Sequence, residues 1–215
     1  ISFSSDAVVT NCTISNNTSL IWGAGGISVW GCSPVFYNCL IKNNYAEQYG
    51  GAVVANTSPG PTFINCTFVK NRTENREADI WLNGTEMIFI NSILWDSGTE
   101  QIEFNGTGEN TVTFVNSLVR GGIESIESLF NYEWNDVSWD GAGNMDSYPL
   151  FADTANGDYR LGNYSPAIGA GTASVTIGGT AFTASSTDID GNARPNPSGS
   201  NPDIGAYENA LGTPS

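Results

Sequence analysis

The sequence predicts an all-β protein, a right-handed parallel β-helix (solenoid) of about five coils with an irregular C-terminal cap. Three observations support this prediction: a short motif recurs at a nearly constant interval, each copy alternates as a strand does, and no helical period accompanies it. The chain has 215 residues. We expect residues 1–125 to form the coils, and residues 126–215 to form a capping module and the start of a linker.

The recurring motif contains an Asn flanked by apolar residues, and its copies lie 27, 27, 26 and 25 residues apart. A unit this short cannot bury its own apolar face, so we expect the coils to stack about 4.8 Å apart, as paired strands do. One predicted inward column consists of Val9, Phe36, Phe63, Phe89 and Phe114. A second consists of Ile14, Ile41, Phe68, Leu94 and Val119.

The Asn of each motif falls between these two columns, where the strand must turn. Asn tolerates left-handed backbone geometry, and its side-chain amide can bond to the same group one coil away. Each such bond stabilises the fold by about 1 kcal/mol. The predicted asparagine ladder consists of Asn11, Asn38, Asn65, Asn91 and Asn116.

A second strand recurs after a glycine pair, or at the corresponding place in later coils. Alternation predicts two further inward columns. These are Ile27, Ala52, Ile80 and Ile102, and then Val29, Val54, Leu82 and Phe104. The residues between them are expected on the outer face, namely Ser28, Val53, Trp81 and Glu103.

The cysteines share a column with serines, which consists of Cys12, Cys39, Cys66, Ser92 and Ser117. A position that accepts Cys or Ser requires a small side chain rather than a crosslink, so we expect buried free thiols. An oxidising compartment would permit a Cys12–Cys39 disulfide instead. Cys32 lies outside the repeat and is left unassigned.

Charge and hydropathy restrict the partners. Seven basic and 22 acidic residues give a net charge of −15, which opposes binding to nucleic acid or to an anionic membrane. Neutral glycans and divalent cations remain compatible. No stretch approaches the ~20 apolar residues of a membrane-spanning helix. The chain does not begin with Met, and we expect a mature product or an excised piece of a secreted or cell-surface protein.

The 25–27-residue period fades after residue 125, and other motifs follow. The most specific are Asp188-Ile189-Asp190-Gly191-Asn192-Ala193-Arg194-Pro195 and Pro202-Asp203-Ile204-Gly205-Ala206-Tyr207-Glu208. This series, over roughly residues 85–208, resembles the choice-of-anchor Q domain at the ends of bacterial secreted and surface β-helix proteins. The resemblance implies a secreted or cell-envelope location and no particular reaction. Gly169 stands where that family commonly has Asp.

The same residues can cover the open end of a solenoid. We expect Arg194 to pair with Asp203 or Glu208 and so to close the cap. The alternative is a Ca²⁺ site formed by Asp188, Asp190 and Asn192, because hard cations prefer clustered oxygen ligands. No other cofactor is expected.

Two classes of function remain open. Exposed aromatic rings can stack on sugars, and the candidates for an extracellular glycan are Trp30, Trp81, Trp95 and Tyr49. The alternative is a polysaccharide lyase or glycoside hydrolase, for which Asp79 and Glu103 are the candidate carboxylates. Both carboxylates are interpreted more simply as solvated surface, as are the two lysines, Lys42 and Lys70, so no catalytic residue is assigned. We therefore expect a spacer, adhesin or filament subunit that binds a glycan or copies of itself.

Overall fold

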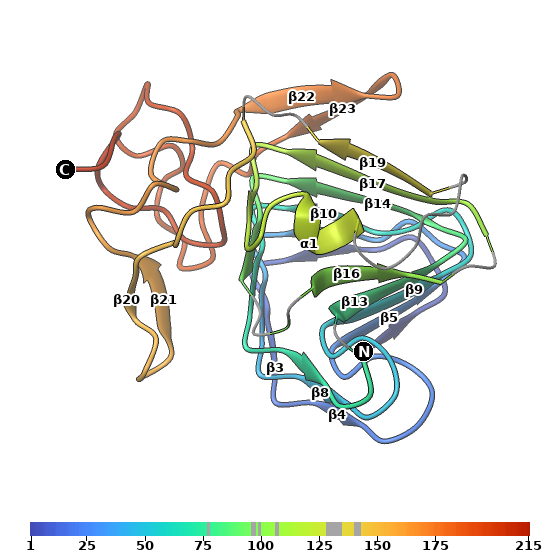
Figure 1. The fold of residues 1–215 in the computed structure, drawn as a ribbon. Coiled ribbons are helices and arrows are strands. Elements are labelled where there is room, and N and C mark those ends of the chain that lie inside the picture. Colours follow the sequence, from blue (N-terminus) through green and yellow to red (C-terminus); the bar gives the residue numbers. More distant parts are fainter. Residues whose placement is uncertain (77, 96–97, 99, 106–107, 128–134, 140–142) are drawn as a thin grey trace.

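The computed structural model describes residues 1–215 except 77, 96–97, 99, 106–107, 128–134 and 140–142. Short parallel strands stack coil on coil into a solenoid, and the C-terminal residues pack against one of its sides (Figure 1). The predicted fold class, an all-β parallel solenoid of about five turns, is confirmed.

Three parallel sheets form the walls of the solenoid. The first contains β1 (Ser2–Phe3), β5 (Ile27–Trp30), β9 (Val53–Asn56), β13 (Ala78–Asn83) and β16 (Glu100–Phe104). The second contains β2 (Val8–Thr10), β6 (Val35–Tyr37), β10 (Thr62–Ile64), β14 (Glu86–Ile90), β17 (Asn110–Val115) and β19 (Asn135–Trp139). The third contains β3 (Thr13–Ser15), β7 (Leu40–Lys42), β11 (Thr67–Val69), β15 (Ile93–Trp95) and β18 (Leu118–Val119).

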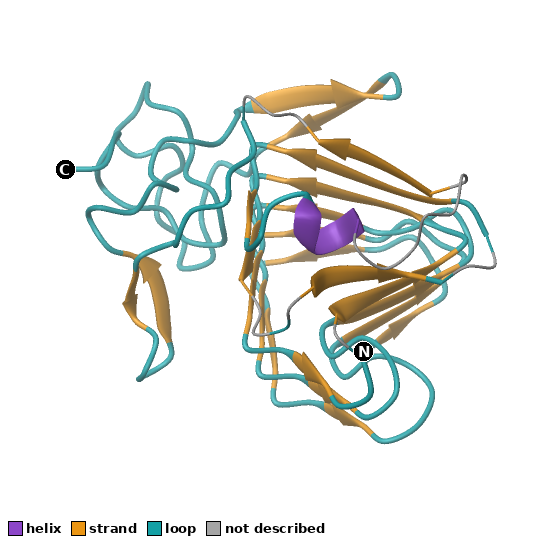
Figure 2. Ribbon diagram, in the orientation of Figure 1, coloured by secondary structure: helices purple, strands orange, loops and turns teal. Residues whose placement is uncertain are grey.

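Smaller elements complete the fold. A three-stranded sheet lies at one corner and contains β4 (Thr18–Ser19), β8 (Tyr45–Ala46) and β12 (Arg72–Thr73). Figure 2 shows one short helix, α1 (Glu124–Glu127), among the described residues. Ile126 of α1 is buried in the same apolar cluster as the solenoid core. The helix therefore covers the interior beside β16.

Residues beyond the solenoid are mostly loop, with two antiparallel hairpins (Figure 2). These are β20 (Phe151–Asp153) with β21 (Asp158–Leu161), and β22 (Ser174–Ile177) with β23 (Thr180–Thr183). The parallel sheet itself continues past the predicted boundary between residues 125 and 126, because β19 pairs in register with β17.

The core consists of the predicted columns. The rings of Phe36, Phe63, Phe89 and Phe114 stack with centroids 4.8, 5.4 and 5.1 Å apart and interplanar angles of 16°, 15° and 8°. All four are fully buried. Offset stacking adds about 0.5–1.5 kcal/mol per pair to the burial of each ring. The second column, from Ile14 to Val119, is buried as predicted.

The Cys and Ser column is explained by hydrogen bonding. Cys66 Sγ donates to the carbonyls of Phe36 and Ile64, both at 3.5 Å. Ser92 Oγ contacts the equivalent carbonyls, of Phe63 at 3.2 Å and Ile90 at 3.0 Å. The position therefore requires a small donor that bridges two coils, and both residue types supply one. All four cysteines are free thiols, and Cys12 is the one that is partly exposed.

In one coil, strand β9 is shifted by a residue relative to both predicted columns. Val53, rather than Val54, pairs with Ile27 and Ile80. Val53 and Ala55 therefore face the core, and the prediction that Val54 points inward and Val53 outward is wrong. The alignment relied on the glycine pair, which precedes the strand and does not fix where pairing begins.

The predicted Asn column forms a corner of the solenoid. All five residues have a positive φ, between 45° and 53°, the left-handed geometry that Asn tolerates. Backbone bonds keep the corner in register, since the Asn38 N–H donates to the Ile64 carbonyl at 3.1 Å. One rung of the predicted ladder is present, in which Asn38 Nδ2 donates to Asn11 Oδ1 at 2.9 Å.

The remaining side chains of this column have other partners. They point toward the C-terminal residues and donate to backbone carbonyls there: Asn65 to Asp203 at 3.0 Å, Asn91 to Thr172 at 2.8 Å and Asn116 to Ala170 at 2.9 Å. The prediction that Asn65, Asn91 and Asn116 bond to one another is therefore wrong. Side chains at this corner point out of the solenoid, so they contact the C-terminal module rather than the equivalent Asn of the next coil.

Asparagine ladders do run along the axis, but most of their rungs use other residues. Asn17 Nδ2 donates to Asn44 Oδ1, and Asn44 Nδ2 to Asn71 Oδ1, both at 2.9 Å. A second ladder joins Asn105 to Asn83 at 3.1 Å and Asn83 to Asn56 at 2.9 Å.

Candidate functional site

Three aromatic side chains from successive coils stack at the corner between β4–β8–β12 and the sheet that contains β13. Trp22 lies between β4 and β5, Tyr49 lies between β8 and β9, and Trp81 lies in β13. The ring centroids of Trp22 and Tyr49 are 5.3 Å apart at 25°, and those of Tyr49 and Trp81 are 4.9 Å apart at 60°. We call these three residues the aromatic cluster.

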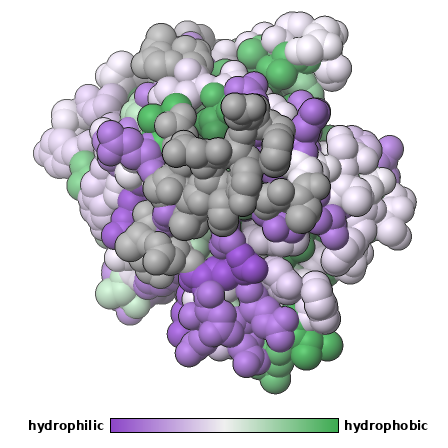
Figure 3. Space-filling model, turned by 45° about the vertical axis from the view of Figure 1, so that its right-hand side comes forward, coloured by the Kyte–Doolittle hydropathy of each residue, from purple (hydrophilic) through white to green (hydrophobic). Residues whose placement is uncertain are grey.

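Exposure increases outward through the aromatic cluster. Trp81 is 7% exposed, Tyr49 is half-buried and Trp22 is 73% exposed. Leu20 and Ile21, which precede Trp22, are also exposed, at 61% and 68%, and Figure 3 shows a small hydrophobic patch beside a larger hydrophilic one at the lower edge of the molecule. Because covering apolar surface is favourable, an indole ring held open to solvent offers a ligand a contact surface.

Arg76 fixes the inner part of the aromatic cluster. Its guanidinium lies 5.1 Å from the Tyr49 ring centroid and 5.8 Å from that of Trp81, within the range of a cation–π interaction. Arg76 Nε donates to the Gln48 carbonyl at 3.0 Å, and Arg76 Nη1 forms an ion pair with the Glu103 carboxylate. These contacts hold the rings that support Trp22.

The interpretation of Asp79 and Glu103 as solvated surface is wrong. Both lie on the outer face of their strands, yet Asp79 is 2% and Glu103 6% exposed. The loop that carries Arg76 approaches them: Arg76 pairs with Glu103, and Thr73 Oγ1 donates to Asp79 Oδ1 at 3.3 Å. A polysaccharide could reach these carboxylates only if this loop moved.

The other predicted glycan-binding residues lie elsewhere. Trp30 ends β5 and is 41% exposed, with no aromatic partner among the described residues. Trp95 is half-buried and packs edge-on against Tyr148, with centroids 5.7 Å apart. The structure therefore brings Tyr49 and Trp81 together and separates Trp30 and Trp95 from them.

Both lysines approach the C-terminal module. The Nζ atoms of Lys42 and Lys70 lie 5.4 and 5.8 Å from the Tyr159 ring centroid. Lys70 Nζ also donates to the Thr154 carbonyl at 2.6 Å. Hairpin β20–β21 thus rests on the two lysines.

The C-terminal module is organised around Arg194. Its Nε donates to Glu208 Oε2 at 2.8 Å, and neither side chain is exposed. Its Nη1 donates to Asn38 Oδ1 at 2.8 Å and its Nη2 to the Gly205 carbonyl at 2.9 Å. Of the two predicted partners, Glu208 is the one that forms the ion pair, and the same guanidinium joins the module to the Asn corner.

Asp203 has a different role within the module. Its carboxylate accepts from the Gly169 N–H at 2.7 Å and from the Asn209 N–H at 2.6 Å. Burial raises the pKa of Asp203 to about 7, and burial also lowers the pKa of Arg194. Removing a charged group from water disfavours its charged form, which accounts for both directions.

The predicted calcium ligands form a turn. Asp188 Oδ1 accepts from the N–H groups of Asp190 and Asn192 at 3.0 and 2.8 Å. Its Oδ2 accepts from Asn192 Nδ2 at 3.1 Å and from the Glu208 N–H at 3.0 Å. No cluster of three or more His, Cys, Asp or Glu side chains suited to a metal occurs among the described residues. The calcium site stays a prediction.

Sequence reasoning missed Trp22 and Arg76. Neither belongs to a repeated column, and Trp22 is three residues before its glycine pair whereas Tyr49 is one residue before its own. The described residues also contain no helix long and apolar enough to cross a membrane.

Comparison with known proteins agrees with this architecture. A family model described as a right-handed β-helix region matches residues 1–135. A search of curated proteins finds no match to the chain. The family match spans more than half of the 215 residues and coincides with the stacked parallel strands. The chain therefore belongs to the right-handed β-helix family.

Proposed function

We propose that this chain is a structural β-helix of the cell surface or extracellular space that binds a neutral glycan through its aromatic cluster. The observation that carries the proposal is the Trp22 ring, 73% exposed and supported from beneath by Tyr49 at 5.3 Å. A flat, pre-positioned aromatic face suits the apolar face of a sugar ring, because little conformational freedom is lost on binding.

Charge favours a neutral rather than an acidic glycan. The chain carries a net charge of −15, and Glu47 and Glu74 lie beside the same corner, where Tyr45 Oη donates to Glu74 Oε2 at 3.0 Å. Arg72 lies over the Tyr45 ring at 4.5 Å, so the repulsion of a polyanion comes from the net charge of the whole chain rather than from this corner alone.

The C-terminal module would serve as the anchoring end, as its resemblance to the choice-of-anchor Q domain implies. The buried Arg194–Glu208 pair joins the two motifs that carry this resemblance. The solenoid would act as a stiff rod, since side-chain stacks and ladders run along its axis.

The test is binding to a panel of neutral and acidic polysaccharides, measured by glycan array and then by isothermal titration calorimetry. We expect Trp22→Ala to weaken binding of the recognised neutral glycan at least about tenfold, as for a central aromatic anchor. Trp22 is exposed, so this change should leave the thermal midpoint almost unaltered.

Trp30→Ala is the matched control, because Trp30 is exposed but lies outside the aromatic cluster. Equal loss of binding in both variants, or preference for an acidic glycan, would contradict the proposal. Release of new reducing ends from the bound polysaccharide would instead favour a hydrolase.

A further inference from the structure

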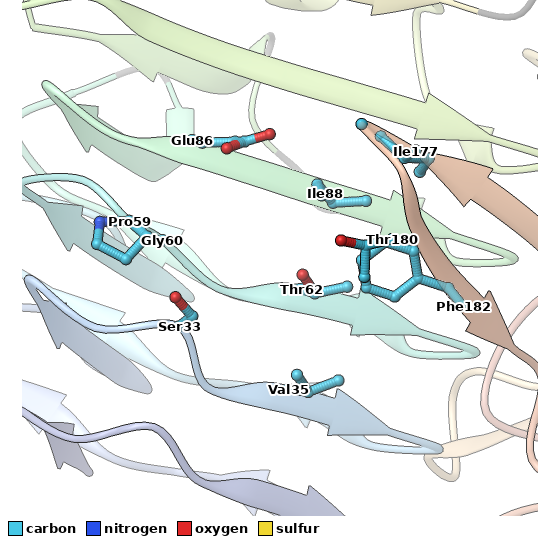
Figure 4. Close-up of a pocket in the computed structure, with 11 residues that line it drawn as sticks. Ser33, Val35, Pro59, Gly60, Thr62, Glu86, Ile88, Ile177, Thr180 and Phe182 are labelled. Carbon is cyan, nitrogen blue, oxygen red and sulfur yellow. The ribbon is translucent and has the colours of Figure 1, made fainter.

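A groove lies on the outer face of the second sheet, beneath the tip of hairpin β22–β23 (Figure 4). Its volume is about 400 Å³. Val35, Thr62 and Ile88 of three successive strands form its floor and pair in register. Ile177 and Phe182 of the hairpin form one wall. Two segments distant in sequence therefore build it.

The hairpin covers only part of this outer face. Its Val175, Ile177 and Phe182 pack against a cluster of buried residues on this face, Ile64, Ile88 and Ile90. The column two residues before Ile64 and Ile90 in each strand forms the floor of the groove, where Val35 is half-buried and Thr62 and Ile88 are 7% and 8% exposed. At the tip, a Cβ added to Gly178 or Gly179 would meet nothing within 4 Å. The tip thus projects over the groove without closing it.

Carboxylates supply the charge of this surface. Glu86 is exposed and lines the groove, and it also lines an adjoining cavity of about 440 Å³ to which Glu109 contributes. No lysine or arginine is among the described residues that line the two cavities. An apolar floor beside carboxylates complements a ligand that carries both aliphatic and cationic groups.

The hairpin offers main-chain groups as well. β22 and β23 form a separate two-stranded sheet, and no third strand pairs with either among the described residues. An extended peptide can add to a free strand edge through backbone hydrogen bonds and place alternate side chains in a pocket.

We propose that this groove binds an extended segment of a partner protein in which lysine or arginine alternates with aliphatic residues. The aliphatic side chains would lie on Val35 and Phe182, and a cationic side chain would reach Glu86. A second copy of this chain fits less well, because each copy carries a net charge of −15. The proposal is independent of glycan binding at the aromatic cluster.

The probe is a short, end-blocked peptide of alternating lysine and valine, titrated into the ¹⁵N-labelled full chain at low ionic strength. Two matched peptides carry serine or glutamate in place of lysine. We expect the lysine peptide to shift the amide resonances of Thr62, Ile88 and Thr180, the serine peptide to bind more weakly, and the glutamate peptide not to bind. Added salt should weaken binding of the lysine peptide, because it screens the charge interaction.

Glu86→Gln should weaken binding of the lysine peptide about fivefold, the effect of losing one partly exposed charge pair. Glu124→Gln, at an exposed position of α1, is the matched control and should have no effect. The proposal is overturned if lysine and serine peptides bind equally, or if the two variants behave alike. It is also overturned if a neutral oligosaccharide shifts these resonances while the peptide does not, or if the free protein self-associates through this face.

Discussion

In the solenoid each buried position recurs coil after coil, whereas in the C-terminal module each buried polar group is used once. Phe63 is stacked between Phe36 and Phe89, which are its own equivalents. Arg194 instead contacts Glu208, Asn38 and Gly205, which do not occupy equivalent positions of a repeat. Stability in the first region is spread over many similar contacts, and in the second it depends on a few dissimilar ones. Substitutions in the two regions should therefore differ in how far their effects extend.

The largest expected effect is the loss of one ring from the Phe stack. Phe89→Ala should lower the free energy of unfolding by about 3–5 kcal/mol, because the cavity lies between the rings of Phe63 and Phe114. Chemical denaturation measures this. Val8→Ala, at a 69% exposed position, is the control and should change the value by less than about 0.5 kcal/mol. A loss below about 1 kcal/mol for Phe89→Ala would contradict a close-packed interior.

The next effect should remain within the C-terminal module. Glu208→Gln leaves the buried Arg194 guanidinium without its ion pair and should cost about 3 kcal/mol. Hydrogen exchange should show faster amides between residues 167 and 209 and unchanged amides in β10 and β14. Asp158→Asn, which removes an exposed ion pair with Arg160, should cost less than about 1 kcal/mol. Equal loosening of the solenoid would show that the two regions are not separable.

The pH dependence of the module is a smaller effect. The pKa of Asp203 is about 7 in the folded chain and about 3.9 in an unfolded one. Within this window the folded state keeps a proton that the unfolded state has released. The contribution of the Asp203 carboxyl to stability is therefore largest below about pH 4 and falls as the pH rises through about 7. Between pH 5 and pH 7 this contribution decreases by about 2 kcal/mol.

Asp203→Asn removes this titration, so the comparison that matters is the slope of stability against pH rather than its absolute value. Thermal unfolding of both proteins across this range measures it. If the two slopes coincide, Asp203 does not titrate as its burial requires.

Much of the solenoid could be predicted because its period is visible in the sequence. The 25–27-residue spacing predicts that Phe63 lies beside Phe36. The position of each Asn between two inward columns predicts the corner, and the residue type predicts its left-handed backbone. The ladder of Asn17, Asn44 and Asn71 could also have been predicted from the sequence, since each of these residues follows a corner Asn by six residues. What failed was local: the first paired residue of β9 is set by the backbone rather than by the glycine pair, which exchanged Val53 and Val54.

The candidate site was less predictable, because its contacts come from loops without a period. Tyr49 and Trp81 were identified as aromatics near strand edges, but Trp22 has no fixed spacing to its glycine pair. Trp95 was assigned to the surface, and Tyr148, distant in sequence, packs against it. Asp79 and Glu103 look exposed from alternation alone, and a loop carrying Arg76 covers them.

The corner Asn residues, besides turning the chain, hold the C-terminal module in place. Asn91 Oδ1 accepts from the Thr172 N–H, and Asn91 Nδ2 donates to the Thr172 carbonyl, both at 2.8 Å. The Asn91 backbone carbonyl separately accepts from the Gly205 N–H at 2.8 Å. Asn91→Gly keeps the positive φ accessible and removes only the side-chain bonds.

Amide-resolved hydrogen exchange in this variant is the most direct test. We expect the Thr172 amide to exchange at least about tenfold faster, at about 1 kcal/mol for each lost bond, while the Gly205 amide and the strands of the solenoid stay protected. Unchanged protection at Thr172, or equal loss of protection in the solenoid, would show that the Asn91 side chain does not hold the module.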